Sequence, residues 1–145
     1  MSLDGVYEPD NIFAAIVRGD TPCAKVYEDA DTLAFMDAFP QGLGHTLVVH
    51  KRSRARNLLD AETAELNALI ATVRRIARAQ RAAFNPDGVT VMQFNGAASG
   101  QTIFHLHFHV IPRWDGKPLG RHAQGMADPR GLAELAAKIA AAVER

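Results

Sequence analysis

The chain has 145 residues and 48% of them are hydrophobic, which predicts one domain, residues 1–145, with a core of its own. Its 16 basic and 16 acidic side chains cancel, so no overall field favours nucleic acid or an acidic membrane as a partner. The single cysteine, an N-terminus unlike a secretory signal and the lack of any apolar run near roughly 20 residues predict a cytoplasmic protein without a membrane span.

The N-terminal third predicts a short helix and then three strands. We expect Asp10 to cap the helix and Gly19 to end it. The apolar side of this helix has four residues: Ile12, Phe13, Ile16 and Val17. Residues 24–29 and 32–37 should pair as a hairpin, because a short polar turn separates two β-favouring runs. A loop with one proline and two glycines then leads to a third strand, residues 45–50.

The middle of the chain predicts its longest helix, residues 61–83, which Asp60 opens. Its core face carries apolar residues at helical spacing: Leu66, Leu69, Ile70, Val73, Ile76 and Ala77. Four arginines lie mostly off that face: Arg74, Arg75, Arg78 and Arg81. We interpret them as a solvated surface, with a nucleic-acid-binding surface as the minor alternative.

Two further strands follow the long helix. A turn at residues 85–88 leads to a fourth strand at 89–95. A loop of small residues at 96–101 then leads to a fifth strand at 103–112. Because consecutive strands are joined by short links, we expect them to form an antiparallel sheet.

The last helix is expected to begin after Asp128, with Pro129 at its first position. Its buried stripe should contain five apolar residues: Leu132, Leu135, Ala136, Ile139 and Val143. Together these elements predict an α+β domain, a five-stranded antiparallel sheet with one long and two shorter helices. We expect the helices to pack on the face opposite the histidines of the fifth strand.

Three histidines alternate with apolar residues at positions 105–110 (HLHFHV). Alternation with period two places successive side chains on opposite faces of a strand, so Leu106, Phe108 and Val110 should enter the core. The imidazoles should line the other, exposed face, with neighbours about 6.5–7 Å apart along the strand.

Three interpretations of this row remain open. Two histidines two residues apart can share a zinc ion, but a third is too far along a flat strand to join them easily. Three purely structural histidines are a second interpretation, in which each ring must find partners for its polar edges. The third, which the residues favour, is attack of a neutral imidazole on phosphorus while neighbouring imidazoles orient it and neutralise the oxyanion.

A loop of small and polar residues, 95–102 (NGAASGQT), precedes the histidines. It brings backbone N–H groups, an amide and a hydroxyl to the start of the same strand, and such a nest suits phosphate oxygens. Small polar loops are common, so the loop alone is weak evidence. Its place beside three histidines favours chemistry at phosphate.

These segments resemble one family. Residues 100–113 (GQTIFHLHFHVIPR) resemble the signature of the histidine triad (HIT) family, and residues 24–51 resemble its N-terminal half, so that the likeness covers about residues 11–113. It points to the Hint-like nucleoside phosphoramidases. The resemblance implies a nucleotide hydrolase without a cofactor that cleaves purine nucleoside phosphoramidates at the α-phosphate. It also implies a homodimer with a ten-stranded sheet, joined through residues 61–83 and the edge of the fourth strand.

The resemblance assigns catalytic roles to four histidines. His107 would be the nucleophile and would form a nucleotidyl-imidazole intermediate that water opens. His109 would bind a phosphate oxygen and help to hold the developing charge. His105 and His45 would fix the orientation of the other two. An exposed loop histidine is the alternative interpretation of His45.

The resemblance also implies a nucleotide-binding site. Gln101 and Thr102 would contact the phosphate and the leaving group, and Asn95 and the Gly100 backbone would complete the phosphate cradle. Asp37 would accept both ribose hydroxyls, although a turn residue at a strand end is the alternative. An apolar slot for a purine would consist of residues whose alternative role is simply core: Ile12, Phe13, Ile16, Phe35, Leu47 and Ile103.

The chain departs from the family pattern at a zinc site. In many bacterial members of the family that the chain resembles, two cysteines and a histidine form a structural zinc site; this chain has Asn11, Ala14 and Ser53 at those positions. Those side chains supply no thiolate or imidazole, so we predict no metal. His50 and His122 match no family role and are predicted to be surface residues.

The third histidine bears on the reaction. The related nucleotidyl transferases have a glutamine there, so His109 favours hydrolysis. Dinucleoside polyphosphates remain an alternative substrate, and a nucleotide-binding regulatory module with weak turnover is a third possibility. Trp114 and the residues after it are expected to reach the mouth of the site and to select the leaving group.

Overall fold

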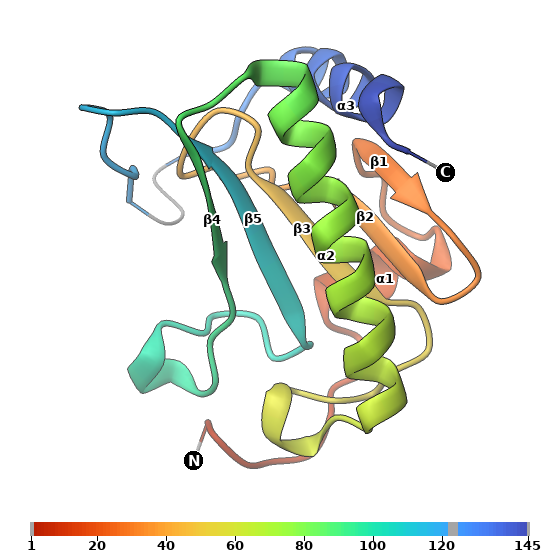
Figure 1. Cartoon of the computed structure of the whole chain (residues 1–145). Helices are drawn as coiled ribbons and strands as arrows, with labels where there is room; N and C mark the ends of the chain where they lie inside the picture. The colour runs from red at the N-terminus through yellow and green to blue at the C-terminus, as the bar shows by residue number, and fades with distance from the viewer. Residues whose placement is uncertain (1, 122–124, 145) are drawn as a thin grey trace.

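The computed structural model describes residues 2–121 and 125–144, and its centre is one antiparallel sheet of five strands (Figure 1). The strand order is β1-β2-β3-β5-β4, which places β1 and β4 at the edges. In chain order the strands are β1 Lys25–Glu28, β2 Thr32–Met36, β3 Thr46–His50, β4 Gly88–Met92 and β5 His107–Arg113. Each neighbouring pair is antiparallel, which confirms the predicted α+β fold class.

Helices α2, Thr63–Phe84, and α3, Pro129–Ala142, cover one face of the sheet (Figure 1). The predicted buried stripe of α3 is confirmed: Leu132, Ala136 and Ile139 are buried in the core. The two remaining residues of the stripe, Leu135 and Val143, are partly buried and pack against it. Asp128 caps this helix as expected, because its carboxylate accepts the Arg130 N–H at 3.0 Å. None of the helices in the described part of the chain combines the length and apolar character that a membrane crossing requires.

The core face of α2 differs from the predicted one at Ile70. Ile70 is 53% exposed and lies outside the core, whereas its neighbour Leu69 is fully buried. Two polar residues, Thr72 and Gln80, are buried on the core face instead. Both have hydrogen-bond partners there: Thr72 Oγ1 lies 2.7 Å from Thr32 Oγ1, and the two protons of Gln80 Nε2 are shared among three nearby acceptors on the sheet and its loop.

Helix α1, Ile12–Arg18, packs on the opposite face of the sheet, which is the histidine face. Its Phe13 belongs to a buried cluster with Leu33, Phe35, Leu47 and Val49. The expectation that all helices avoid this face is therefore wrong. Alternation along β2 and β3 gives both faces apolar residues, so the second face also needs a cover.

Two predicted helix caps move by one or more residues. Asn11 caps α1, because its side chain accepts the Ala14 N–H at 2.9 Å; Asp10 does not. Gly19 ends that helix with φ +85°, as predicted. Asp60 belongs to a short 3₁₀-helix, Leu58–Asp60, where its carboxylate accepts the Asn57 N–H. Helix α2 therefore begins later, at Thr63.

Strands β4 and β5 are shorter than predicted on the side of the histidines. The ladder between β3 and β5 begins at the pair Val49 and His107, so the residues from Ile103 to Leu106 are not strand. The Leu106 N–H donates to the carbonyl of Ala55, outside the sheet. His105 therefore lies in a bend in front of β5, and its position depends on contacts other than the ladder.

Candidate functional site

His107 and His109 of β5 point to one side of the sheet, His105 lies just before this strand, and the apolar residues that alternate with them point to the other side, as the alternation predicts. Leu106, Phe108 and Val110 belong to the core under α2 and α3. His105, His107 and His109 are only 3%, 8% and 2% exposed, so the expected open row of imidazoles is wrong. Rings from other segments cover them. The rings of His107 and His109 tilt toward each other, and their centroids are 4.9 Å apart.

His107 is held in one tautomer by the backbone carbonyl of His105. Its Nδ1 lies 2.6 Å from the carbonyl oxygen of His105. A carbonyl can only accept a hydrogen bond, so Nδ1 carries the proton and Nε2 of the neutral ring carries the lone pair. Phe13 of α1 contacts the same ring edge-on, with centroids 4.8 Å apart. The arrangement presents Nε2 as a potential nucleophile.

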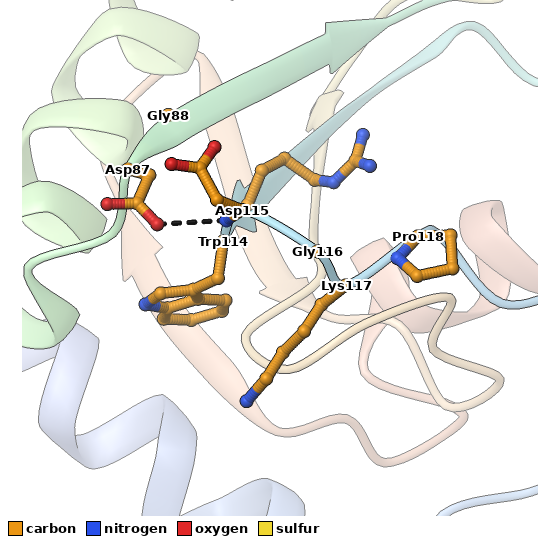
Figure 2. Close-up of a pocket in the computed structure, with 8 residues that line it drawn as sticks. Asp87, Gly88, Trp114, Asp115, Gly116, Lys117 and Pro118 are labelled. Atoms are coloured by element: carbon orange, nitrogen blue, oxygen red, sulfur yellow. Dashed lines mark hydrogen bonds between the residues drawn. The ribbon is translucent and has the colours of Figure 1, made fainter.

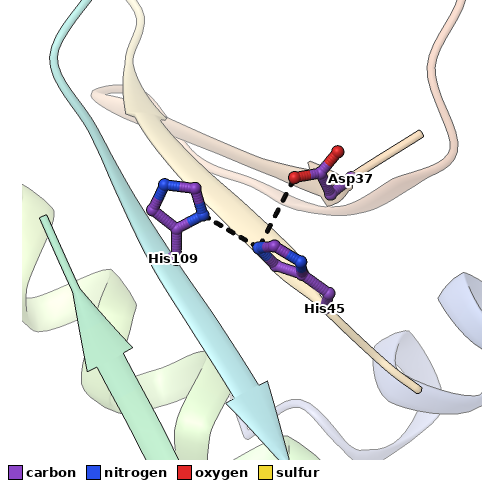
Figure 3. A group of neighbouring side chains, drawn as sticks. All are labelled: Asp37, His45 and His109. Atoms are coloured by element: carbon purple, nitrogen blue, oxygen red, sulfur yellow. Dashed lines mark hydrogen bonds and ion pairs between the residues drawn. The ribbon is translucent and has the colours of Figure 1, made fainter. Parts of the chain in front are cut away.

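His109 is held in the opposite tautomer through His45. The backbone N–H of Gln41 donates to His45 Nδ1 at 3.0 Å, so the proton of neutral His45 is on Nε2. His45 Nε2 lies 2.9 Å from His109 Nδ1 and 3.5 Å from the Asp37 carboxylate (Figure 3). Because His109 Nδ1 accepts, neutral His109 carries its own proton on Nε2 and can donate it. His45 is fully buried, which excludes the exposed-loop alternative.

His105 is an uncharged member of the group. Its Nδ1 is 2.8 Å from the hydroxyl of Tyr7. Burial, together with the nearby His107 and His50, lowers the pKa of His105 to about 4, so the ring is neutral at physiological pH. Its carbonyl oxygen, as described above, holds His107.

Asp37 lies at the end of β2 and is buried. One carboxylate oxygen accepts the Phe39 N–H at 2.8 Å, which is the turn role given as its alternative. The other faces His45 (Figure 3). Binding of ribose by Asp37 stays a prediction.

The predicted phosphate loop is held together mainly by its own hydrogen bonds. Gln101 is buried, with its Oε1 accepting the Gly96 N–H and its Nε2 donating to the carbonyl of Arg56. Asn95 Oδ1 accepts the Leu58 N–H at 2.9 Å. The loop's backbone donors at 96, 97, 99, 100 and 101 all have partners within the loop or in Ser2, so the open nest of N–H groups is wrong.

Direct phosphate contacts by this loop stay predictions. Thr102 is exposed at its end, next to the histidine segment. Gly100 has φ +113°, which only glycine adopts readily, and the ring of Phe94 lies beneath it. Phe94 also contacts His109, with ring centroids 5.4 Å apart. The loop is thus packed directly against the histidine group.

Most of the predicted purine slot is one cluster. Phe13, Phe35 and Leu47 are buried together, and Ile16 and Ile103 pack against them. Ile12 lies outside this cluster and is partly exposed. Phe35 and Leu47 are so well covered that they serve as core, whereas Phe13 joins the cluster to His105 and His107. Binding of a purine here stays a prediction.

The sequence patterns missed several residues of the site. Tyr7 contacts His105 and Phe94 contacts His109, but neither residue belongs to a periodic pattern or motif. The rings of His105, His107 and His109 are called the triad below. His50 was expected at the surface and is 6% exposed, because its Nδ1 accepts the N–H groups of Arg52 and Ser53 at the end of β3. His122 lies outside the described residues.

One group in the described residues has metal-ligand chemistry: Asp37, His45 and His109, whose ligand atoms lie within 4.8 Å of one another (Figure 3). The two histidine nitrogens face each other at hydrogen-bond distance with a proton between them. A metal needs a lone pair from each nitrogen. The donor set therefore fits a hydrogen-bonded chain better than a metal ligand set.

Two adjoining hollows lie at the far end of β5, beyond the histidines. The larger, about 490 Å³, is lined by Arg113, Trp114 and Lys117 together with Asp87, whose carboxylate accepts the Asp115 N–H (Figure 2). The tail then returns to the loop before β3, where the Gly120 N–H donates to the Gln41 carbonyl at 2.7 Å. The tail thus supports the loop that positions His45, and a role in selecting the leaving group stays a prediction.

Comparisons with known proteins place this site in context. The HIT domain model matches residues 18–116. A Hit-like protein of Bartonella henselae, whose crystal structure holds an unknown ligand, is 50% identical with a TM-score of 0.91, over 96% of this chain and 100% of that chain.

The names of two relatives state an enzyme activity. The adenosine 5′-monophosphoramidase hnt1 of Schizosaccharomyces pombe is 38% identical over 104 residues, 70% of this chain and 73% of that protein. The adenylylsulfatase HINT3 of Arabidopsis thaliana is 36% identical over 120 residues, 79% of this chain and 60% of that protein.

Proposed function

This chain belongs to the HIT domain family and is a nucleotide hydrolase, and from that premise we propose that it cleaves purine nucleoside phosphoramidates at the α-phosphate. The observation that carries the proposal is the pair of opposite tautomers on β5. His107 Nε2 has a lone pair to attack with, and the neighbouring His109 Nε2 has a proton to donate.

The first step forms a covalent intermediate on His107. Its Nε2 attacks the α-phosphorus, the phosphorus–nitrogen bond to the leaving amine breaks, and the amine departs after it has taken up one proton from solvent. The ring then carries a positive charge, which the carbonyl of His105 stabilises through the Nδ1–H bond of 2.6 Å. This bond also prevents Nδ1 from acting as the attacking atom.

The second step releases the nucleotide. Water adds to phosphorus and loses one proton to solvent, which balances the proton taken up in the first step. The bond to His107 Nε2 breaks, and the products are a nucleoside monophosphate and the free neutral imidazole. His109 would donate from Nε2–H to a phosphate oxygen whose charge grows in both steps; the contact of its Nδ1 with His45 supports this role. Because donor and nucleophile are pre-set by fixed contacts, little reorganisation is needed during reaction.

Further members of the proposed site bind the nucleotide. Asp37 would accept the ribose hydroxyls, and Thr102 and Gly100 would lie against the phosphate. Phe13, with the cluster around it, would contact the purine. Asn95 and Gln101 would act indirectly by holding the loop, because their amide oxygens accept hydrogen bonds from the loop and from the residues before α2.

The setting of the activity is also part of the proposal. We propose a cytoplasmic homodimer in which β4, an edge strand with Val91 46% exposed, and α2 form the contact. Sedimentation at micromolar concentration tests it, and a monomer would contradict the proposal.

The experiment that tests the function compares three substrate classes. Adenosine 5′-phosphoramidate, diadenosine polyphosphates and adenylyl sulfate are given to the wild type and to His107→Ala. We expect preference for the phosphorus–nitrogen bond, loss of turnover in the variant, and an adenylylated His107 in acid-quenched wild type by mass spectrometry. Preference for a polyphosphate or the sulfate contradicts the substrate, and tight binding of AMP without turnover of any substrate favours the regulatory alternative.

A further inference from the structure

The segment before α1 lies outside the part of the chain that the HIT domain model matches, and yet it reaches the histidines. Arg56 anchors it by donating to the carbonyl oxygens of Ser2 and Val6, at 3.0 and 3.2 Å. Asn57 donates to the carbonyl of Leu3 at 2.9 Å. Both anchoring side chains are buried, so residues 2–7 are fixed to the body of the protein.

Tyr7 is the residue of this segment that touches the triad. Its hydroxyl lies 2.8 Å from His105 Nδ1, and the two rings are 5.7 Å apart. The guanidinium of Arg54 lies 5.2 Å from the centre of the Tyr7 ring. The phenol is thus held between a cation and the first histidine, with its hydroxyl directed at the imidazole.

His105 needs such an anchor because it precedes the β5 ladder. The first ladder pair is His107 with Val49, so no strand neighbour sets the backbone of His105. Its carbonyl oxygen is nevertheless the group that sets the tautomer of His107. A carbonyl that must accept at 2.6 Å requires its residue to be held firmly.

We propose that Tyr7 is a positioning residue for the nucleophile: its hydrogen bond to His105 holds the carbonyl that keeps His107 in the attacking tautomer. The proposal rests on the function proposed above. Tyr7 touches no reacting atom, so its effect passes through His105. The neutral state of His105 suits this role, because an uncharged ring beside His107 does not oppose the positive charge that forms there.

The test is Tyr7→Phe, which keeps the ring and its contact with Arg54 and removes only the hydroxyl. The matched control is Val6→Ala, because the Val6 side chain is 82% exposed while its carbonyl still binds Arg56. In rapid-quench experiments we expect adenylylation of His107 to slow about tenfold in Tyr7→Phe, with AMP affinity within about twofold of wild type. The control should match wild type in both. An unchanged rate in Tyr7→Phe, or an equal loss in Val6→Ala, overturns the proposal.

A second readout does not depend on turnover. Ring-nitrogen NMR of the free protein reports the Nδ1–H of His107, which should exchange faster with water in Tyr7→Phe than in wild type or Val6→Ala. An unchanged signal overturns the proposal. If wild type itself shows no adduct on His107, the proposed function fails, and the ring signal still decides whether Tyr7 holds the tautomer.

Discussion

Replacement of His45 by alanine tests the hydrogen-bonded chain that sets the tautomer of His109. His45 is fully buried, accepts the Gln41 N–H at 3.0 Å and donates to His109 Nδ1 at 2.9 Å. Alanine leaves the Gln41 N–H and the His109 Nδ1 without this hydrogen-bond partner, and a buried polar group that loses its hydrogen bond costs about 1–3 kcal/mol. Since Gln41 is only partly buried, we expect the free energy of unfolding to fall by about 2–4 kcal/mol.

The same change should reduce turnover. Without His45, the Nδ1 of His109 no longer accepts a hydrogen bond, so either nitrogen of the ring can carry its proton and donation from Nε2 is no longer assured. Loss of a partner that orients a functional imidazole costs about 10–100-fold in activity, equivalent to about 1.4–2.8 kcal/mol of transition-state stabilisation. We expect most of this loss in kcat, since AMP binding uses other residues as well.

His45→Gln is the matched variant, because its amide offers an acceptor and a donor as His45 does. Urea unfolding gives the stability of each variant, and steady-state hydrolysis of adenosine 5′-phosphoramidate below the unfolding transition gives kcat. Glutamine should recover part of both losses. A folded His45→Ala protein with the kcat of wild type would refute the reasoning.

Three further predictions concern the ribose, pH and metal. Asp37→Asn keeps an oxygen for the Phe39 N–H but removes the charge, so calorimetry should show about tenfold weaker AMP binding with deoxy analogues spared; equal losses contradict the ribose role. The folded-state pKa of His105, about 4, lies below the ordinary value near 6.5, so only the unfolded chain takes up this proton between those pH values. The contribution of His105 to the free energy of unfolding is therefore complete above about pH 6.5 and falls by about 3 kcal/mol toward pH 4. In urea unfolding, the free energy of unfolding of His105→Asn should decline less steeply with falling pH than that of wild type, and equal slopes refute the assignment. EDTA should leave hydrolysis unchanged, and stoichiometric zinc in the purified protein would contradict the metal-free prediction.

The strands and helices followed from local patterns because each pattern is decided by a few neighbouring residues. Asp128 and Pro129 mark the start of α3, and the alternation at residues 105–110 separates histidines from core residues, as predicted. Element ends were less predictable. Asn11 rather than Asp10 caps α1, because the choice depends on which side chain reaches the first turn. Ile70 lies at the edge of the apolar stripe of α2, where only the neighbouring elements decide burial.

The sequence by itself determined that the histidines and the apolar residues between them point to opposite sides, since the alternation of side chains along extended backbone is a local property. Only the tertiary structure decided the protonation and orientation of the imidazoles. Gln41, His45 and Tyr7 lie roughly 60 to 100 residues from the three histidines in the sequence. His45 contacts the Nδ1 of His109, Gln41 sets the tautomer of His45, and Tyr7 contacts the Nδ1 of His105. Such contacts follow from how loops and the N-terminal segment pack together, which no local periodicity encodes.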